Sequence, residues 1–351
     1  MLRFMWTFKP RSGGARRRGT SAGRGLRPLG AALGILAGLC LLQPARSSLA
    51  AAGQYKVDEL SPGVFVYLPE DILEQQGDPR FARPGNAGFV ITPQGVVVID
   101  TTNSPFNARD VLYEIRQRTR AEVRYVIDTS AMPDLMLGNE VFEDFRPTIF
   151  STPEAQAAIA RYRQNLPERL DANWRLARSM RGIHPTVPTR TFDRPATLPV
   201  PGQPIRLIPL GTNAIPGDAA VFLPNAKVVF LGDVFENAYI PRIGAGNIRH
   251  WIQTLREAES WNAETYVPAH GAPGGKQQVA EFRRFLEWLN EAVESRVRRG
   301  ESLEQIEKEL LPFRNYSWHA PELEPQALEA VYQQVTGAAA APRARLSANP
   351  D

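Results

Sequence analysis

Three titratable residues stand where predicted strands end, and strand ends are where α/β enzymes often collect catalytic groups. Asp134 follows the strand-like run at the start of "YVIDTSAMPDLMLGNEVF", Asp233 ends "KVVFLGD", and His270 stands in "ETYVPAHG". Carboxylates and an imidazole that meet in one place can act as a general acid/base. The same groups are also metal ligands.

Each of these residues also has a structural interpretation. Asp134 comes directly after Pro133 and before an apolar run, so it could cap a helix. Asp233 could order a turn at a strand end. His270 is the strongest candidate, because neither helix formation nor core packing calls for a histidine there. The other histidines (His184, His250 and His319) lack the spacing of metal ligands and are expected at surface or structural positions.

The elements that must position these residues follow from the apolar pattern. Alternating strands and helices run to about residue 275, and a helical region follows. Strands are predicted at 63–68, in a hairpin over 86–102, and at 123–128, 205–210, 219–224, 227–233 and 264–270. Helices are predicted at 107–119, 152–166 and 247–260, the start of a further helix after the turn that follows the strand at 123–128, and an irregular stretch at 171–203. Beyond Gly275 an apolar stripe recurs every three or four residues (Val279, Phe282, Leu286, Leu289, Val293 and Val297).

The positive charge of the chain lies almost wholly in its first fifty residues. That segment holds nine of the 41 Lys and Arg residues and no acid, which leaves 32 basic against 37 acidic residues in the rest. A mildly acidic main part gives no reason to expect nucleic acid as a partner.

The same segment has the layout of an export signal. A basic stretch precedes the short apolar run Leu29–Leu42, and small residues follow it near Ala50 and Ala52. The run is short for a membrane span. We therefore expect residues 1–52 to be a signal peptide, the protein to be periplasmic or secreted, and no stable membrane anchor after cleavage. An uncleaved N-terminal anchor is the alternative.

Four ordered phrases resemble the metallo-β-lactamase-fold hydrolases: "NAGFVITPQGVVVIDTT", "VRYVIDTSAMPDLMLGNEVF", "GDAAVFLPNAKVVFLGDVF" and "YVPAHGAPG". The resemblance covers roughly Leu60 to Gly275. It implies an α/β fold of α+β four-layer type, an αββα sandwich over residues 53–275, with a helical C-terminal extension at 276–336. A disordered tail is expected at 337–351.

The family binds two metal ions through a set of histidines and acids, and this chain departs from that set. Matched residue by residue, the expected histidines fall on Ser130, Met132, Leu135 and Ala214, while Asp134, Asp233 and His270 are kept. Leu and Ala offer no lone pair, and Met is a soft ligand. The resemblance therefore implies no two-zinc site and a degenerate one that binds no metal or one weakly held divalent ion. Asp134, Asp233 and His270 could hold that single ion, which could be Mn²⁺, Mg²⁺, Fe²⁺ or Zn²⁺.

Three functions stay open on this pattern. The first is a pseudoenzyme that binds a small molecule or a protein through the former active-site cleft. The second is a hydrolase of an ester, lactam or thioester that uses one metal or a carboxylate–histidine cluster, with Asp134 and His270 as its catalytic residues. The third is a structural or interaction protein that acts through the C-terminal helices. Fold alone does not choose among substrates.

Overall fold

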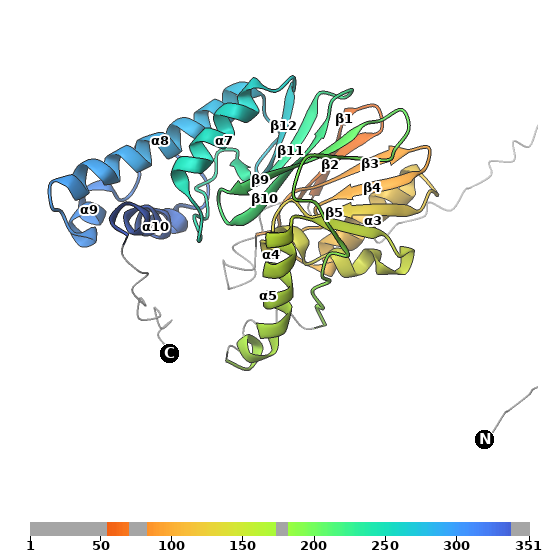
Figure 1. Cartoon of the computed structure of the whole chain (residues 1–351), viewed down its shortest axis with the longest axis horizontal. Helices are drawn as coiled ribbons and strands as arrows, with labels where there is room; N and C mark the ends of the chain where they lie inside the picture. Colours follow the sequence, from red (N-terminus) through yellow and green to blue (C-terminus); the bar gives the residue numbers. More distant parts are fainter. Residues whose placement is uncertain (1–54, 70–82, 173–181, 338–351) are drawn as a thin grey trace, which may run out of the picture. The chain divides into compact units, whose positions relative to one another are not determined.

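The computed structural model describes residues 55–69, 83–172 and 182–337, which lie in the unit Ala50–Asp351. Two β-sheets pack face to face, with helices on their outer faces (Figure 1). This is the predicted four-layer αββα arrangement. The predicted signal peptide, and the predicted tail apart from Gly337, fall outside the described residues.

The first sheet has seven strands in the order β1-β2-β3-β4-β5-β6-β7. Its antiparallel half comes first, and β4 to β7 are parallel. The strands are β1 (Tyr55–Ser61), β2 (Val64–Pro69), β3 (Ala87–Thr92), β4 (Gly95–Ile99), β5 (Val123–Ile127), β6 (Thr148–Ser151) and β7 (Arg190–Thr191). The parallel half places the loop after β5 at one edge of the sandwich, and this loop carries Asp134.

The second sheet has five strands in the order β12-β11-β10-β9-β8. Only the β11–β12 pair is parallel. The strands are β8 (Ala196–Leu198), β9 (Ile205–Thr212), β10 (Pro216–Leu223), β11 (Val228–Glu236) and β12 (Thr265–His270). Since β11 and β12 run parallel, their carboxyl ends meet, and Asp233 and His270 come to the same side of the molecule.

The core between the sheets is built from the inward residues of both. Val97 and Ile99 of β4 face it from one side, and Val221 and Phe230 face it from the other. Phe230 lies so close to Gly88 of β3 that a Cβ there would approach its ring to 2.2 Å, so the sheets need a glycine at this point. The interface is apolar throughout, as expected for strands buried on both faces.

Helices cover the outer faces. Helix α3 (Pro105–Arg118) begins at Ser104, whose hydroxyl accepts from the Asn107 amide at 3.4 Å, and it buries Val111 and Ile115 on the first sheet. Proline at the first helical position and serine before it are favourable start signals. Helix α5 (Pro153–Ala172) follows β6 and packs its apolar side chains against Met136 and Leu137 of the loop after β5, and α7 (Ile248–Ser260) covers the second sheet.

The C-terminal extension packs on that second helical layer. It comprises α8 (Lys276–Arg298), α9 (Leu303–Leu310), the short η2 (Pro321–Leu323) and α10 (Glu324–Thr336). The predicted apolar stripe is buried from Val279 to Val293, joined by Phe285, and Val297 is partly buried against it. The stripe is therefore part of the core and not an exposed docking face.

Three local features differ from the sequence expectations. Strands β1 and β6 form where none was predicted, and the helix expected after Met132 is only the four-residue α4 (Pro133–Met136), followed by the 3₁₀ helix η1 (Asn139–Phe145). The irregular stretch holds the short strands β7 and β8. Within the part of the chain that the structure describes, no helix has the length and apolarity to cross a membrane.

Candidate functional site

Asp134 lies in the first turn of α4 and does not cap it. The helix begins after Met132, whose side chain makes no capping hydrogen bond, so the structural interpretation of Asp134 as a cap is wrong. The loop is held from both sides instead. The Gly85 amide donates to the Asp134 carbonyl at 2.9 Å, and the Thr101 amide donates to the Leu135 carbonyl at 2.6 Å. Both bonds use backbone carbonyl groups, so the buried Asp134 side chain can contact residues of other elements.

His270 ends β12 beside Glu236, the last residue of β11, with which it is paired in register. The His270 amide donates to Glu236 Oε2 at 3.1 Å, and His270 Nδ1 lies 3.1 Å from both carboxylate oxygens. A carboxylate on Nδ1 fixes the orientation of the ring. The other ring nitrogen, Nε2, is 3.3 Å from Asp134 Oδ2. The structure thus brings Asp134 and His270 together.

Arg242 completes this group and was not recognised from the sequence. Its Nη1 donates to Asp134 Oδ2 at 3.3 Å, and the side chain is 28% exposed. Asp233 lies buried on β11, where burial and the negative charges of Asp134 and Glu236 raise its pKa. We call Asp134, Asp233, Glu236, Arg242 and His270 the charged cluster. Nothing local in the sequence around Arg242 marks it, because its partner is 108 residues away.

The protonation states follow from burial and from these neighbours. Burial raises the pKa of Asp134, but Arg242 and His270 outweigh it and hold that pKa below its usual range. Burial lowers the pKa of His270, while Glu236 and Asp134 raise it, to about 10. Burial, reinforced by Asp134, raises the pKa of Asp233 well above its usual range. The cluster therefore combines a carboxylate with an imidazolium and a guanidinium, and Asp233 takes up a proton easily.

Several buried polar atoms of the cluster have no hydrogen-bond partner among the described residues. They are Asp134 Oδ1, Asp233 Oδ2 and His270 Nε2, the last of which faces Asp134 without hydrogen-bond geometry. Buried polar groups are normally paired, because leaving one unpaired costs about 1–3 kcal/mol. Three such atoms lie in this one cluster, which makes it the candidate site of the molecule.

Three of the four positions where histidines were expected (Ser130, Leu135 and Ala214) are buried, and the fourth, Met132, is half-buried. Leu135 is fully buried beside Gly85 and Gly232, and Ala214 is 2% exposed, with its amide donating to Asp218 Oδ2 at 3.0 Å. Ser130 accepts from the Met132 amide at 3.4 Å. These contacts replace metal coordination with apolar packing and local turn hydrogen bonds.

A family-type metal centre does not fit these residues. Among the residues that the structure describes, no group of three or more His, Cys, Asp or Glu side chains is arranged to hold a metal ion. The donor chemistry agrees, because Leu135 and Ala214 provide no ligand atom. The guanidinium of Arg242 also lies against Asp134, one of the acids a metal would need.

The C-terminal extension reaches the edge of the cluster through His319. Its backbone pairs with the loop after β11, since the His319 amide donates to the Ala238 carbonyl and the Ile240 amide donates to the His319 carbonyl, both at 2.9 Å. The His319 ring stacks on Tyr239 at 4.7 Å, and Tyr239 lies 5.9 Å from the His270 ring. The sequence placed His319 only in the extension. Its position next to the site depends on packing of the extension against the loop after β11, which no local sequence pattern predicts.

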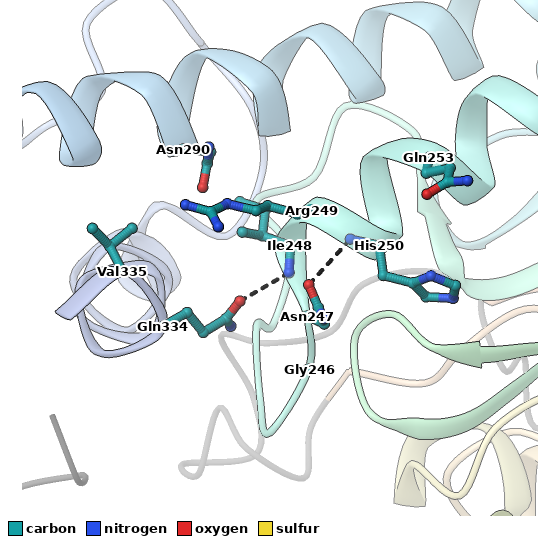
Figure 2. Close-up of a pocket in the computed structure, with 9 residues that line it drawn as sticks. All are labelled: Gly246, Asn247, Ile248, Arg249, His250, Gln253, Asn290, Gln334 and Val335. Atoms are coloured by element: carbon teal, nitrogen blue, oxygen red, sulfur yellow. Dashed lines mark hydrogen bonds between the residues drawn. The ribbon is translucent and has the colours of Figure 1, made fainter. Parts of the chain in front are cut away.

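A cavity of about 440 Å³ lies at the start of α7, against the C-terminal helices (Figure 2). The Ile248 amide donates to Gln334 Oε1 of α10 at 2.8 Å, and Asn247 caps α7 by accepting from the His250 amide at 3.1 Å. Arg249 pairs with Glu294 of α8 at 2.8 Å. These polar groups tie the extension to α7, and no residue of the charged cluster lines the cavity.

Comparisons with known proteins bear on the fold. No protein-family model matches the chain. It is 20% identical over 230 residues to the linear primary-alkylsulfatase of Pseudomonas sp. (strain ATCC 19151), and the match covers 56% of this chain and 43% of the relative. The chain thus spans less than half the length of that curated relative.

Two solved structures resemble it more widely. A metallo-β-lactamase from Pontibacter korlensis superimposes with a TM-score of 0.54 at 18% identity, over 67% of this chain and 99% of that one. The stereoselective inverting sec-alkylsulfatase of Pseudomonas sp. gives a TM-score of 0.59 at 17% identity, over 84% of this chain and 52% of the neighbour. Such low identities speak to architecture and not to activity, and the architecture they share with this chain is the metallo-β-lactamase fold.

Proposed function

We propose that this chain is an exported metallo-β-lactamase-fold protein that binds a small polar molecule at the charged cluster without hydrolysing it. The observation that carries the proposal is the set of buried, unpartnered atoms on Asp134, Asp233 and His270. They offer acceptors and donors within one cluster, so a ligand with both kinds of group would satisfy them.

Hydrolysis needs a group that can activate water, and the cluster is poorly arranged for this. Metal-dependent relatives of this fold lower the pKa of a bound water, but here packing residues take the place of the expected ligands. The imidazole of His270 lies between Glu236 at 3.1 Å and Asp134 at 3.3 Å. With the Glu236 carboxylate on Nδ1 and the charge of Asp134 facing Nε2, the ring is held as an imidazolium and not as a base toward water.

One observation favours hydrolysis as a second candidate. The Glu236 carboxylate orients His270 through Nδ1, as a third group orients the base in nucleophilic catalysis. If Nε2 turned from Asp134 toward a substrate, the pair could work without metal on an ester, lactam, thioester or, by analogy with the alkylsulfatase relatives, a sulfate ester. A scaffold role is less well supported, because the apolar stripe of α8 is already buried.

The test is a ligand screen with a turnover assay run in parallel. The protein, purified from its host, is screened by thermal shift against polar metabolites and against the four substrate classes above. A ligand at about 100 times its Kd should stabilise the fold by about 2.7 kcal/mol. We expect a shift without turnover, lost in His270→Gln and in Asp134→Asn.

His250→Gln is the matched control, because that ring lies outside the cluster and contacts the Leu210 carbonyl at 2.9 Å. It should keep the thermal shift. Turnover that disappears in Asp134→Asn or His270→Gln, but persists in His250→Gln, would replace the binding proposal by the hydrolase. Export rests on the layout of residues 1–52 alone, and an intact Met1 in the mass spectrum of the native protein would contradict it.

A further inference from the structure

Two cationic groups converge on a single oxygen of the charged cluster. Asp134 Oδ2 lies 3.3 Å from Arg242 Nη1 and 3.3 Å from His270 Nε2. Burial lowers the pKa of Arg242, but the negative charges of Asp134, Asp233 and Glu236 outweigh it and raise that pKa. These are the acids that a metal ion bound in this place would have to share.

We propose that the guanidinium of Arg242 replaces a metal ion as the positive charge of this site and that its presence keeps divalent cations out. The inference holds whichever ligand the cluster takes. A guanidinium carries its charge at any physiological pH and offers up to five N–H donors in a rigid fork. Among the described residues Asp134 is its one hydrogen-bond acceptor.

The loop that carries Arg242 is anchored at both ends by backbone hydrogen bonds, so the fold itself holds the guanidinium near Asp134. At its start the Asn237 amide donates to the His270 carbonyl at 3.1 Å. At its end the Gly244 amide donates to the Ala214 carbonyl at 3.3 Å, and the Asn247 amide donates to the Asn213 carbonyl at 3.0 Å. The loop of Arg242 is thus tied to the backbone of His270 on one side and, on the other, to the backbone of Ala214, a position where the family has a histidine.

The magnitude of the effect follows from Coulomb repulsion. A divalent ion about 5 Å from the guanidinium would bind at least about tenfold more weakly than without it, even if the screening were as strong as in water. Burial of the site makes the repulsion larger. Removing the charge should therefore raise the affinity of the site for a divalent ion. The remaining acids and His270, once it has released its proton, would move into ligand positions that they do not occupy in this structure, and water would complete the coordination.

The experiment measures metal uptake and not activity. Wild type, Arg242→Met and Arg242→Lys are purified from the host without chelators, dialysed against Zn²⁺ or Mn²⁺, and analysed by elemental mass spectrometry. We expect Arg242→Met to bind one ion at least about tenfold more tightly than wild type. Arg242→Lys keeps the charge and should behave like wild type.

Two further variants guard the interpretation. Arg242→Gln also removes the charge but keeps a polar side chain, so it takes the place of Arg242→Met if that variant misfolds. It should gain metal relative to wild type. Arg249→Met removes an arginine that pairs with Glu294 outside the cluster, and it should not gain metal. The inference is overturned if folded Arg242→Met and Arg242→Gln bind no more metal than wild type, or if Arg249→Met gains as much. Either result leaves ligand binding to be judged by the thermal-shift screen.

Discussion

His270 shows how much of this site is set by individual side chains. Its ring lies between two acids, and one of these acids is shared with Arg242. An ion pair this buried is costly to break, since removing one partner leaves a charge without compensation and costs about 3–5 kcal/mol. The cluster is therefore a coupled unit, and a change at any member affects the others.

Asp100, a buried acid outside the charged cluster, gives a prediction of pH dependence. Asp100 accepts from the Thr129 amide at 2.8 Å and from its hydroxyl at 2.7 Å. Burial nevertheless raises the Asp100 pKa to about 7. Because the folded-state pKa exceeds the unfolded one, the stability from this group is fully present below about pH 4 and is lost as the pH rises to about 7.

Asp100→Asn removes this titration, and asparagine tolerates the positive φ of 54° found there. The free energy of unfolding of the variant, relative to wild type, should rise by a few kcal/mol between about pH 4 and 7 and then stay level. Urea unfolding across this pH range measures the difference. A difference that does not change with pH would show that Asp100 is ionised in the fold at all these pH values.

Individual residues also show what the sequence could reveal. Asp134, Asp233 and His270 were found because each follows a predicted strand and matches a family phrase. Arg242 and Glu236 were not among the predicted site residues, because the partners of both are distant in the chain. Only the folded backbone brings a loop residue such as Arg242 to an acid on another element.

At the scale of elements, close approach of β11 to the loop after β5 holds the two sides of the site together. Gly232, directly before Asp233, has φ +51°, and a Cβ there would lie 2.1 Å from Thr129 Oγ1. That hydroxyl is itself bonded to Asp100. A side chain at Gly232 would thus push against a residue that cannot turn away without losing a buried hydrogen bond.

Gly232→Ala should therefore destabilise the fold by more than backbone strain alone, which is about 1–2 kcal/mol for a left-handed residue. The matched control is Gly300→Ala, at φ +81° with nothing within 4 Å of the added Cβ. We expect Gly300→Ala to cost about 1 kcal/mol and Gly232→Ala at least about twice as much. Equal losses in denaturant unfolding would mean that the contact with Thr129 relaxes freely.

Elements differed in how well their sequence revealed them. Strand β4 was predicted because it is a continuous apolar run directly after the turn at Pro93 and Gln94. Helices α3 and α8 were predicted because their apolar residues repeat every three or four positions. Strand β6 has only four residues, and β1 is an edge strand that buries little, so neither has a strong pattern. The helix after β5 was predicted, but its short length and the contacts of Asp134 depend on tertiary structure.

For the whole molecule, the extension is part of the fold and part of the surroundings of the site. Helix α8 buries its apolar stripe on the second helical layer, Gln334 of α10 bonds to the start of α7, and His319 pairs with the loop that leads to Arg242. The four-layer fold could be predicted from ordered sequence phrases. The link between the extension and the site could not, because it consists of a few backbone bonds and one ring contact.

The central claim is that this site works through protein charges and not through a metal-bound water. The most direct test is the metal content of the wild-type protein, purified from its host without chelators and passed through a desalting column. The account predicts less than one zinc, manganese or iron ion per chain after this step, because the positive charges of Arg242 and His270 already face the Asp134 carboxylate. One or two metal ions retained in stoichiometric amount by folded wild-type protein would contradict it.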